Sequence, residues 1–173
     1  MRTLALVVLA ATTSTFGCMS IGHRGEGAIA TLESRAGSTV LGTATFSQRY
    51  NGVHVRVEVS GLVSGSEHGF HVHEKGDCSA PDASSAGGHF NPAGVAHGKF
   101  SAAVHHAGDL PSLVADANGR ARLDFALPGA TLDAGPGSIM GHSVVVHGAA
   151  DDFTTQPSGN SGARVACGVI RAK

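Results

Sequence analysis

The chain has 173 residues, enough for one domain with a substantial hydrophobic core. Its formal net charge of −1 excludes both the basic surface of a nucleic-acid-binding protein and the acidic bulk of a disordered one. With 25 glycines, no tryptophan and a charged fraction of 14%, the composition favours a compact, turn-rich protein of many short strands.

Residues 1–18 have the pattern of an export signal, because Arg2 supplies a positive charge and the apolar run 4–11 is too short to span a membrane. Cys18 lies where bacterial lipoproteins are cleaved and lipidated, although Thr15 stands where a leucine-like residue is usual. The alternative is a soluble cleaved signal peptide, with Cys18 removed or incidental. We expect export to the periplasm or cell envelope, with membrane attachment if Cys18 is lipidated.

The three cysteines agree with an oxidising compartment. Cys78 and Cys167 are candidates for a disulfide closing a loop of about 90 residues, which the chain-entropy model values at about 4–5 kcal/mol. Cys18 is then the odd cysteine, and lipidation would account for it. The alternative is that Cys78 and Cys167 are unpaired thiols.

After a short tether, residues 19–25, apolar runs predict one domain of strands over residues 26–173. In chain order the predicted strands are residues 28–32, 38–46, 53–60, 71–73, 113–116, 120–125, 143–147 and 163–170. The alternation in 53–60 places His54 on the solvent face, so we interpret it as a surface residue. An Asn118-Gly119 turn predicts a hairpin between the fifth and sixth strands.

About eight strands without an amphipathic helix predict an all-β antiparallel sandwich or barrel. Two glycine- and polar-rich stretches, residues 74–111 and 148–162, are long for such a fold, and long loops are usually functional or disordered. Seven of the eleven histidines fall between His68 and His106, which favours a functional role.

Histidine is the commonest protein ligand for transition metals, so this density predicts a metal site. In the strand-like His71-Val72-His73, both imidazoles point to one face and can reach one ion. His147 ends an apolar strand and could approach the same ion from a neighbour. Nitrogen-only ligation suits copper, zinc or nickel, of which copper binds most tightly.

A second group lies within the first long loop. His106 and Asp109 are three residues apart, a spacing that a tight turn can fold onto one ion, and His97 precedes them. Imidazoles plus one carboxylate in a tetrahedral set suit a structural zinc. His89 lies between the two groups in sequence and could bind one metal through each ring nitrogen.

Simpler interpretations exist, because a lone histidine is more often solvated or hydrogen-bonded in the core than a ligand. Several suitable groups at compatible spacings argue against coincidence. A zincin is excluded, since Asp77 replaces the second histidine of H-E-x-x-H. His68 should be a hydrogen-bonded core residue, and His105 is less suited than its neighbour His106. The histidines interpreted as non-ligands are His23, His54, His68, His105 and His142.

Five sequence blocks stand in a specific order: residues 69–74 (GFHVHE), 85–92 (SAGGHFNP), 106–110 (HAGDL), 144–147 (VVVH) and 162–170 (GARVACGVI). From about residue 26 onward, the chain thereby resembles the copper/zinc superoxide dismutases. The resemblance implies an eight-stranded Greek-key sandwich or barrel, immunoglobulin-like, with two long functional loops.

The resemblance also implies two ligand sets that share one histidine. The implied copper ligands are His71, His73, His89 and His147. The implied zinc ligands are His89, His97, His106 and Asp109. Asp151 would hydrogen-bond ligands of both metals and orient them, with Asp152 as the alternative. Cys78 and Cys167 would form the family's disulfide.

The implied reaction converts two superoxide anions to oxygen and hydrogen peroxide by Cu(II)/Cu(I) cycling, with zinc holding the geometry. Arg164 would pair with the anion and help guide it, and His89 would carry a proton needed for peroxide. Residues 148–162 contain no Lys or Glu, so steering would fall on Arg164, Lys75 and Lys99. This departure bears on the rate of the reaction more than on its nature.

Three functions compete. An exported superoxide dismutase needs all ligands and Arg164. A non-catalytic exported copper- or zinc-binding protein needs the ligands but not Arg164, and a silent relative with a structural role would often lack a copper ligand. Because every one of these residues is present, the sequence favours the dismutase. Superoxide is then the substrate, no nucleic acid is expected as a partner, and a homodimer is compatible with the sequence but not derivable from it.

Lipidation of Cys18 predicts a lipid-modified cysteine as the first residue of the mature protein. Mass spectrometry of the mature N-terminus would detect it. An unmodified serine or threonine start on either side of Cys18 would contradict the prediction.

Overall fold

The structure is a computed structural model that describes residues 27–173. The predicted signal segment, the tether, Cys18 and His23 lie outside the described residues. Over residues 27–173 the fold is all-β, with ten strands and one short 3-10 helix, Ser84–Ala86. In this part of the chain no helix is long and apolar enough to cross a membrane.

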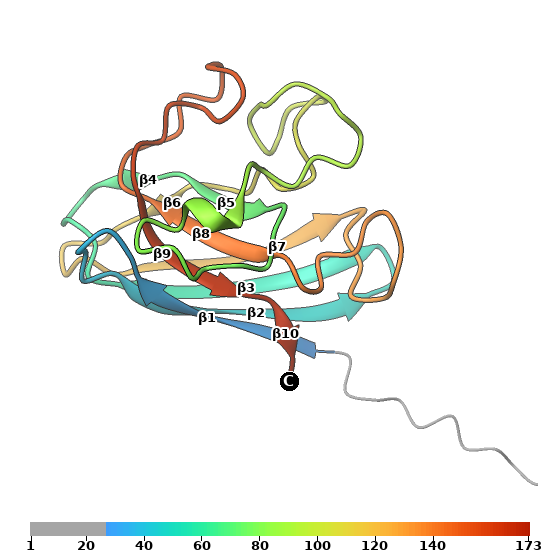
Figure 1. Ribbon diagram of the computed structural model, residues 1–173, viewed down its shortest axis with the longest axis horizontal. Helices are drawn as coiled ribbons and strands as arrows, with labels where there is room; N and C mark the ends of the chain where they lie inside the picture. Colours follow the sequence, from blue (N-terminus) through green and yellow to red (C-terminus); the bar gives the residue numbers. More distant parts are fainter. Residues whose placement is uncertain (1–26) are drawn as a thin grey trace, which may run out of the picture.

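The strands form one curled antiparallel sheet and one small strand pair (Figure 1). Their bounds are β1 Gly27–Ser34, β2 Leu41–Arg49, β3 Gly52–Ser60, β4 Glu67–His68, β5 Phe70–His73, β6 Leu113–Val114, β7 Ala121–Pro128, β8 Ser143–His147, β9 Arg164–Val169 and β10 Arg171–Ala172. The eight-stranded sheet has the order β5-β8-β9-β1-β2-β3-β7, with β10 also paired to β1, while β4 pairs with β6. This arrangement confirms the predicted all-β Greek-key sandwich.

Strand β1 joins the two layers of the sandwich. Its first residues pair with β2 and β10, whereas Glu33 and Ser34 pair with β9. The core lies between the layers, and it is apolar on both sides because side chains alternate along each strand. From β3 it receives Val53, Val55, Val57 and Val59, and from the other layer Phe70, Val72, Val144, Val146 and Ala166. The predicted alternation of β3 is confirmed.

Strand β5 is buried on both faces, unlike β3. Phe70 and Val72 enter the core, so His71 and His73 lie on the outer face, yet these histidines are 0% and 1% exposed. Cover for this face comes from the two long loops, residues 74–111 and 148–162, which stand on the same side of the sheet (Figure 1). The outer face of β5 is therefore an enclosed polar site.

The disulfide joins Cys78, at the start of the first long loop, to Cys167 on β9, with the two Cα atoms 5.8 Å apart. It spans a sequence separation of 89 residues. Cys167 packs with Val145, Ala83 and Ala86 in a small apolar cluster under the loop. The predicted pairing is present, and it attaches the loop that covers the outer face.

The predicted hairpin around Asn118-Gly119 is wrong, although the turn itself forms. Backbone N–H groups of Asn118 and Arg120 donate to the Asp116 carboxylate, which closes the turn. The flanking strands take other partners, since β6 pairs with β4 and β7 pairs along its whole length with β3. Within residues 27–173 strand β7 ends the sheet order, so its second edge has no strand neighbour, and β6 pairs with β4 in the separate two-stranded sheet instead.

Candidate metal centre

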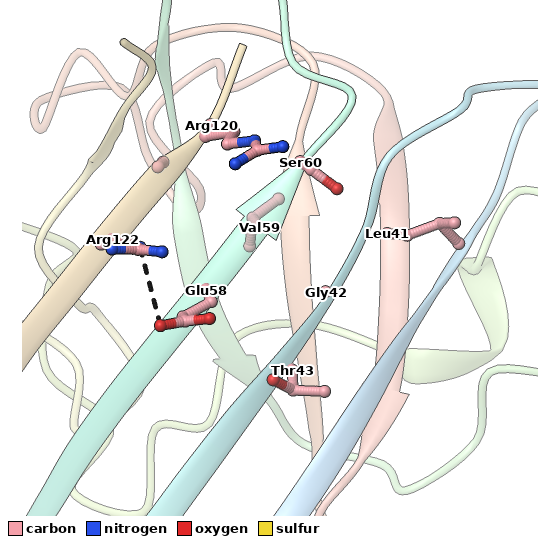
Figure 2. Close-up of a pocket in the computed structure, with 9 residues that line it drawn as sticks. Leu41, Gly42, Thr43, Glu58, Val59, Ser60, Arg120 and Arg122 are labelled. Atoms are coloured by element: carbon pink, nitrogen blue, oxygen red, sulfur yellow. Dashed lines mark ion pairs between the residues drawn. The ribbon is translucent and has the colours of Figure 1, made fainter. Parts of the chain in front are cut away.

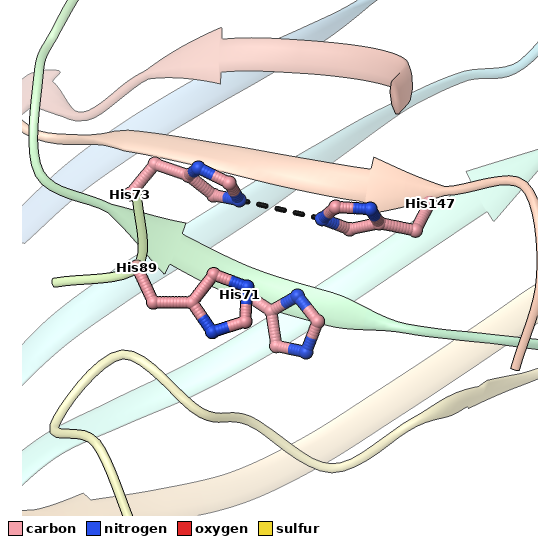
Figure 3. Close-up of side chains that lie close together, drawn as sticks. All are labelled: His71, His73, His89 and His147. Atoms are coloured by element: carbon pink, nitrogen blue, oxygen red, sulfur yellow. Dashed lines mark hydrogen bonds between the residues drawn. The ribbon is translucent and has the colours of Figure 1, made fainter. Parts of the chain in front are cut away.

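The first group of side chains gathers on the outer face of β5 and β8. His71 and His73 come from β5 and His147 ends β8, while His89 reaches in from the first long loop (Figure 3). One ring nitrogen from each lies within 4.8 Å of those of the other three. The His73 and His147 Nε2 atoms are 3.3 Å apart, and the His71 and His89 rings stack with centroids 3.9 Å apart.

A β-bulge places one further side chain opposite this group. The register between β8 and β9 shifts at Val146/His147, so that Arg164 instead of Val165 lies across from His147. A bulge inserts one extra residue and thereby changes which side chain faces a given partner. Arg164 then donates to the carbonyls of Ala83 and Gly87, at 2.7 Å each, which fixes its guanidinium beside the histidines.

Two nitrogens in this group have no hydrogen-bond partner although they are buried. They are His71 Nδ1 and His89 Nε2. In each ring the other nitrogen lies next to a carboxylate: His71 Nε2 is 2.7 Å from Asp151 Oδ2, and His89 Nδ1 is 2.9 Å from Asp109 Oδ1. A ring that donates from one nitrogen presents a lone pair at the other, which is the state that binds a metal.

The second group is built around one carboxylate oxygen. Asp109 Oδ1 lies 2.9 Å from His89 Nδ1, 3.0 Å from His97 Nδ1 and 3.4 Å from His106 Nδ1. The other oxygen, Oδ2, accepts from the backbone N–H groups of Gly98 and His106, which orients the carboxylate. Four donor atoms within 4.8 Å of one another, three imidazole nitrogens and one carboxylate oxygen, fit a tetrahedral zinc site.

Asp151 connects the two groups from the second long loop. Its Oδ2 accepts from His71 and its Oδ1 lies 3.0 Å from His97 Nε2. The neighbouring Asp152 instead accepts from Thr154 and Thr155 within its own loop. Of the two carboxylates considered from sequence, Asp151 is therefore the one in contact with both groups.

The histidines and carboxylates hold protonation states suited to metal binding. Burial lowers the pKa of His71 to about 4, against the opposing effect of Asp151, and lowers that of His147 to about 3. Burial would raise the pKa of Asp109, but the hydrogen bond from His89 and two backbone N–H donors hold this pKa well below its usual range. At neutral pH the rings of His71 and His147 are therefore neutral and the Asp109 carboxylate is ionised, which are the protonation states that bind a metal.

A pocket opens beside the first group. It is lined by loop residues and by three of the four histidines, and the second long loop supplies Gln156, Pro157 and Ser158. Among the residues that line this pocket, Arg164 is the sole Lys or Arg. Lys75 and Lys99 are not part of the lining. The Lys99 ammonium is over the Phe153 ring, 5.6 Å from its centroid. Of the three steering charges expected from sequence, Arg164 alone faces the pocket.

The histidines interpreted as non-ligands lie outside both groups, except His23, which is not described. His68 is buried and lies within hydrogen-bond distance of Ser66 Oγ and the His147 carbonyl, as predicted. His54 pairs with Asp124 on the outer face of β3, at 2.6 Å. The other two bond to backbone carbonyls, His105 to that of His106 and His142 to that of Glu74.

Sequence reasoning missed Gln156, whose side chain bonds the backbone of His97 at both its N–H and its carbonyl. A glutamine in a polar loop gives no signal of such a contact.

Another pocket, on the outer face of β2 and β3 near β7, carries Arg120 and a Glu58–Arg122 ion pair at 3.6 Å (Figure 2). Both groups of metal-ligating side chains found in residues 27–173 lie away from it.

Comparison with known proteins gives concordant matches. The family model described as "Copper/zinc superoxide dismutase (SODC)" matches residues 40–170. A superoxide dismutase [Cu-Zn] of Deinococcus radiodurans is 40% identical, with 99% of this chain and 98% of that protein covered. The crystal structure of a SOD-like protein from Bacillus subtilis has a TM-score of 0.73 at 38% identity, covering 81% of this chain and 95% of that one. The structure of the clock protein EA4 has a TM-score of 0.77 at 40% identity, covering 87% and 96%.

The depressed pKa values predict that the metal-free protein loses stability as pH falls. His71 and His147 have an ordinary pKa of 6.5 and titrate lower in the folded state, so the unfolded chain binds more protons between pH 6.5 and about 4. Their stabilisation, present above pH 6.5, should decline by on the order of 2 kcal/mol each by about pH 5. The raised pKa of His97, due to its contacts with Asp151 and Asp109 acting against burial, offsets part of this loss.

Urea unfolding of the metal-free protein over this pH range is the measurement. His147→Leu should reduce the slope of unfolding free energy against pH. A free energy that is flat or rises on acidification would contradict the prediction.

Proposed function

Because this chain belongs to the copper/zinc superoxide dismutase family, we propose that it is an exported enzyme that converts two superoxide anions to oxygen and hydrogen peroxide. The observation that carries the proposal is the shared position of His89. Its Nδ1 faces the carboxylate of one group, while its Nε2 is buried and free toward the other. One imidazole between two complete donor sets suits a bridged pair of metals.

The ligand assignment follows the two groups of donors. Copper would be held by His71, His73, His89 and His147. Zinc would be held by His89, His97, His106 and Asp109. Bound copper would supply the one-electron exchange between Cu(II) and Cu(I) that both halves of the reaction need. All-nitrogen donors suit the first metal, and the carboxylate with imidazoles suits a structural zinc in the second set.

Arg164 would bind the substrate anion. Its two bonds to the Ala83 and Gly87 carbonyls hold the guanidinium at the pocket without neutralising its charge. A fixed cation in a partly dehydrated pocket attracts a small anion more strongly than a mobile one, because less ordering is needed on binding. His89 Nε2 would then carry one of the two protons that hydrogen peroxide formation requires.

Asp151 would orient a ligand of each metal. Its two oxygens contact His71 and His97 through the ring nitrogens that would not bind metal. Carboxylates in this position fix the imidazole tautomer and raise its basicity as a ligand. The Cys78–Cys167 disulfide would hold in place the loop that supplies His89 and both carbonyl partners of Arg164.

The alternative function is an exported copper- and zinc-binding protein without turnover. It is kept because a relative from Bacillus subtilis, 42% identical over 69% of this chain, is named a superoxide dismutase-like protein. Storage needs the ligand sets alone. The fixed Arg164 guanidinium at the pocket has a use in catalysis and none in storage, so it favours the enzyme.

Export also belongs to the proposal. We take residues 1–18 as its signal, 19–25 as a tether and 26–173 as the catalytic domain, located in the periplasm or cell envelope. Among relatives, one from Brugia pahangi is named an extracellular superoxide dismutase, at 41% identity over 83% of this chain. A disulfide in the domain suits an oxidising compartment. Lipidation of Cys18 would attach this domain to a membrane.

The first prediction for this function concerns Arg164. Protein loaded with copper and zinc should accelerate superoxide decay, and Arg164→Ala should lower the rate constant by about tenfold to a hundredfold by removing anion attraction. Arg164→Lys should retain part of the rate because it keeps the charge. The measurement is direct spectroscopic assay of superoxide decay, with metal content determined for each variant.

Arg122→Ala, in the distant pocket of β7, is the matched control and should leave the rate unchanged. Absence of activity in the fully metal-loaded protein would overturn the enzyme in favour of the metal-binding alternative. Full activity of Arg164→Ala would overturn the role given to this arginine.

The second prediction concerns the partition of ligands. His147→Ala should impair copper binding and activity while sparing zinc, because His147 has no part in the Asp109 group. Metal analysis after equilibration with each ion would show it. His105→Ala, a histidine outside both groups, should leave both metals bound. Equal loss of copper and zinc in the His147 variant would contradict the partition.

A further inference from the structure

The side chain of Gln156 forms a two-point contact with the backbone of one residue in the other long loop. Its Oε1 accepts from the N–H of His97 at 2.8 Å, and its Nε2 donates to the carbonyl of His97 at 3.0 Å. The orientation of the amide is determined by this pair, since only the oxygen can accept and only the nitrogen can donate. The contact copies the exchange of two hydrogen bonds between paired strands.

His97 is held by the same loop at its ring as well. Asp151 Oδ1 lies 3.0 Å from His97 Nε2, on the side of the ring opposite the Asp109 contact. Gly159 permits this approach: a Cβ there would lie 2.6 Å from His97 Nε2 and overlap Asp151 Oδ1, and its φ of 67° favours glycine. Residues 151–159 therefore enclose His97 from both its backbone and its imidazole.

Gln156 also belongs to the wall of the pocket that contains Arg164. With Pro157 and Ser158 it lines the pocket from the side of the second long loop. The residue itself is exposed, so its amide could bond to water instead, and its backbone contact is not forced by burial. One side chain thus connects a wall of the pocket with the backbone of a proposed zinc ligand.

We propose that Gln156 is a positioning residue that couples the two long loops: it fixes the backbone of His97 for zinc and holds its own segment in the pocket wall. The assignment of zinc in this statement rests on the proposed function. The coupling between loops does not, because it follows from the two hydrogen bonds and from the enclosure of His97.

The variant Gln156→Met removes both hydrogen bonds to His97, and a longer one to the Thr154 carbonyl at 3.4 Å, while keeping the length of the side chain. In the metal-free protein, NMR hydrogen exchange should show the His97 amide exchanging about tenfold faster, together with the Asp152 and Gly159 amides that close the second loop. The Arg120 amide, which donates to the Asp116 carboxylate outside both long loops, should keep its rate and serves as an internal reference.

In protein loaded with zinc alone, release of zinc to an excess of chelator should be about tenfold faster in Gln156→Met, the usual scale for loss of a contact that orients a ligand. This readout needs neither copper nor dismutase activity. If the wild type binds no zinc, the proposed function fails, while the exchange measurement still decides whether Gln156 couples the loops.

Gln48→Met is the matched control. Gln48 holds a different loop by the same chemistry, accepting from the Leu132 N–H at 2.7 Å and donating to the Gly52 carbonyl at 3.0 Å. The Gln48→Met variant should leave the rate of zinc release and the exchange rate of the His97 amide unchanged. Unchanged zinc release in Gln156→Met, unchanged exchange of the Asp152 and Gly159 amides, or equal effects in both variants would each overturn the proposal.

Discussion

The two-residue period of β5, β8 and β9 is the constraint on which the rest of the structure depends. On β5 and β8 the residues of one parity, such as Phe70 and Val146, build the core, and the other parity supplies His71, His73 and His147. The bulge at His147 is the one change of register between β8 and β9, and it brings Arg164 rather than a valine to the site face. A single-residue slip would exchange core and site throughout the layer.

Enclosure of that polar face is stable because its buried groups satisfy one another. Buried carboxylates are costly unless they receive hydrogen bonds, and Asp109 and Asp151 receive theirs from histidines and backbone N–H groups. The same bonds determine which nitrogen of each ring stays free. Folding stability and the readiness of the site for metal therefore arise from one set of contacts, whose two unpartnered nitrogens both point to the first group.

Much of the fold and of the site was predictable because local sequence patterns determine it. Alternation located β3 and the core face, and the H-x-H pair with the loop histidines identified the donors. Pairing partners were not predictable in the same way: an Asn-Gly turn specifies a local conformation, but β6 pairs with β4, a strand far from it in the sequence. The role of Asp151 was predicted only from the resemblance to a known family. The contact of Gln156 was not predicted, because a hydrogen bond between a side chain and the backbone of another loop leaves no pattern in the sequence of either loop.

The shared position of His89, reinforced by Asp151 between the same two groups, has a thermodynamic consequence. Two binding sites with a common ligand cannot have independent affinities, and any factor by which occupancy of one changes the other must act equally in reverse. If the protein binds both metals, their order of loading then affects only the route and not the final free energy. The side chains that would couple the two ions are already in contact before either ion binds.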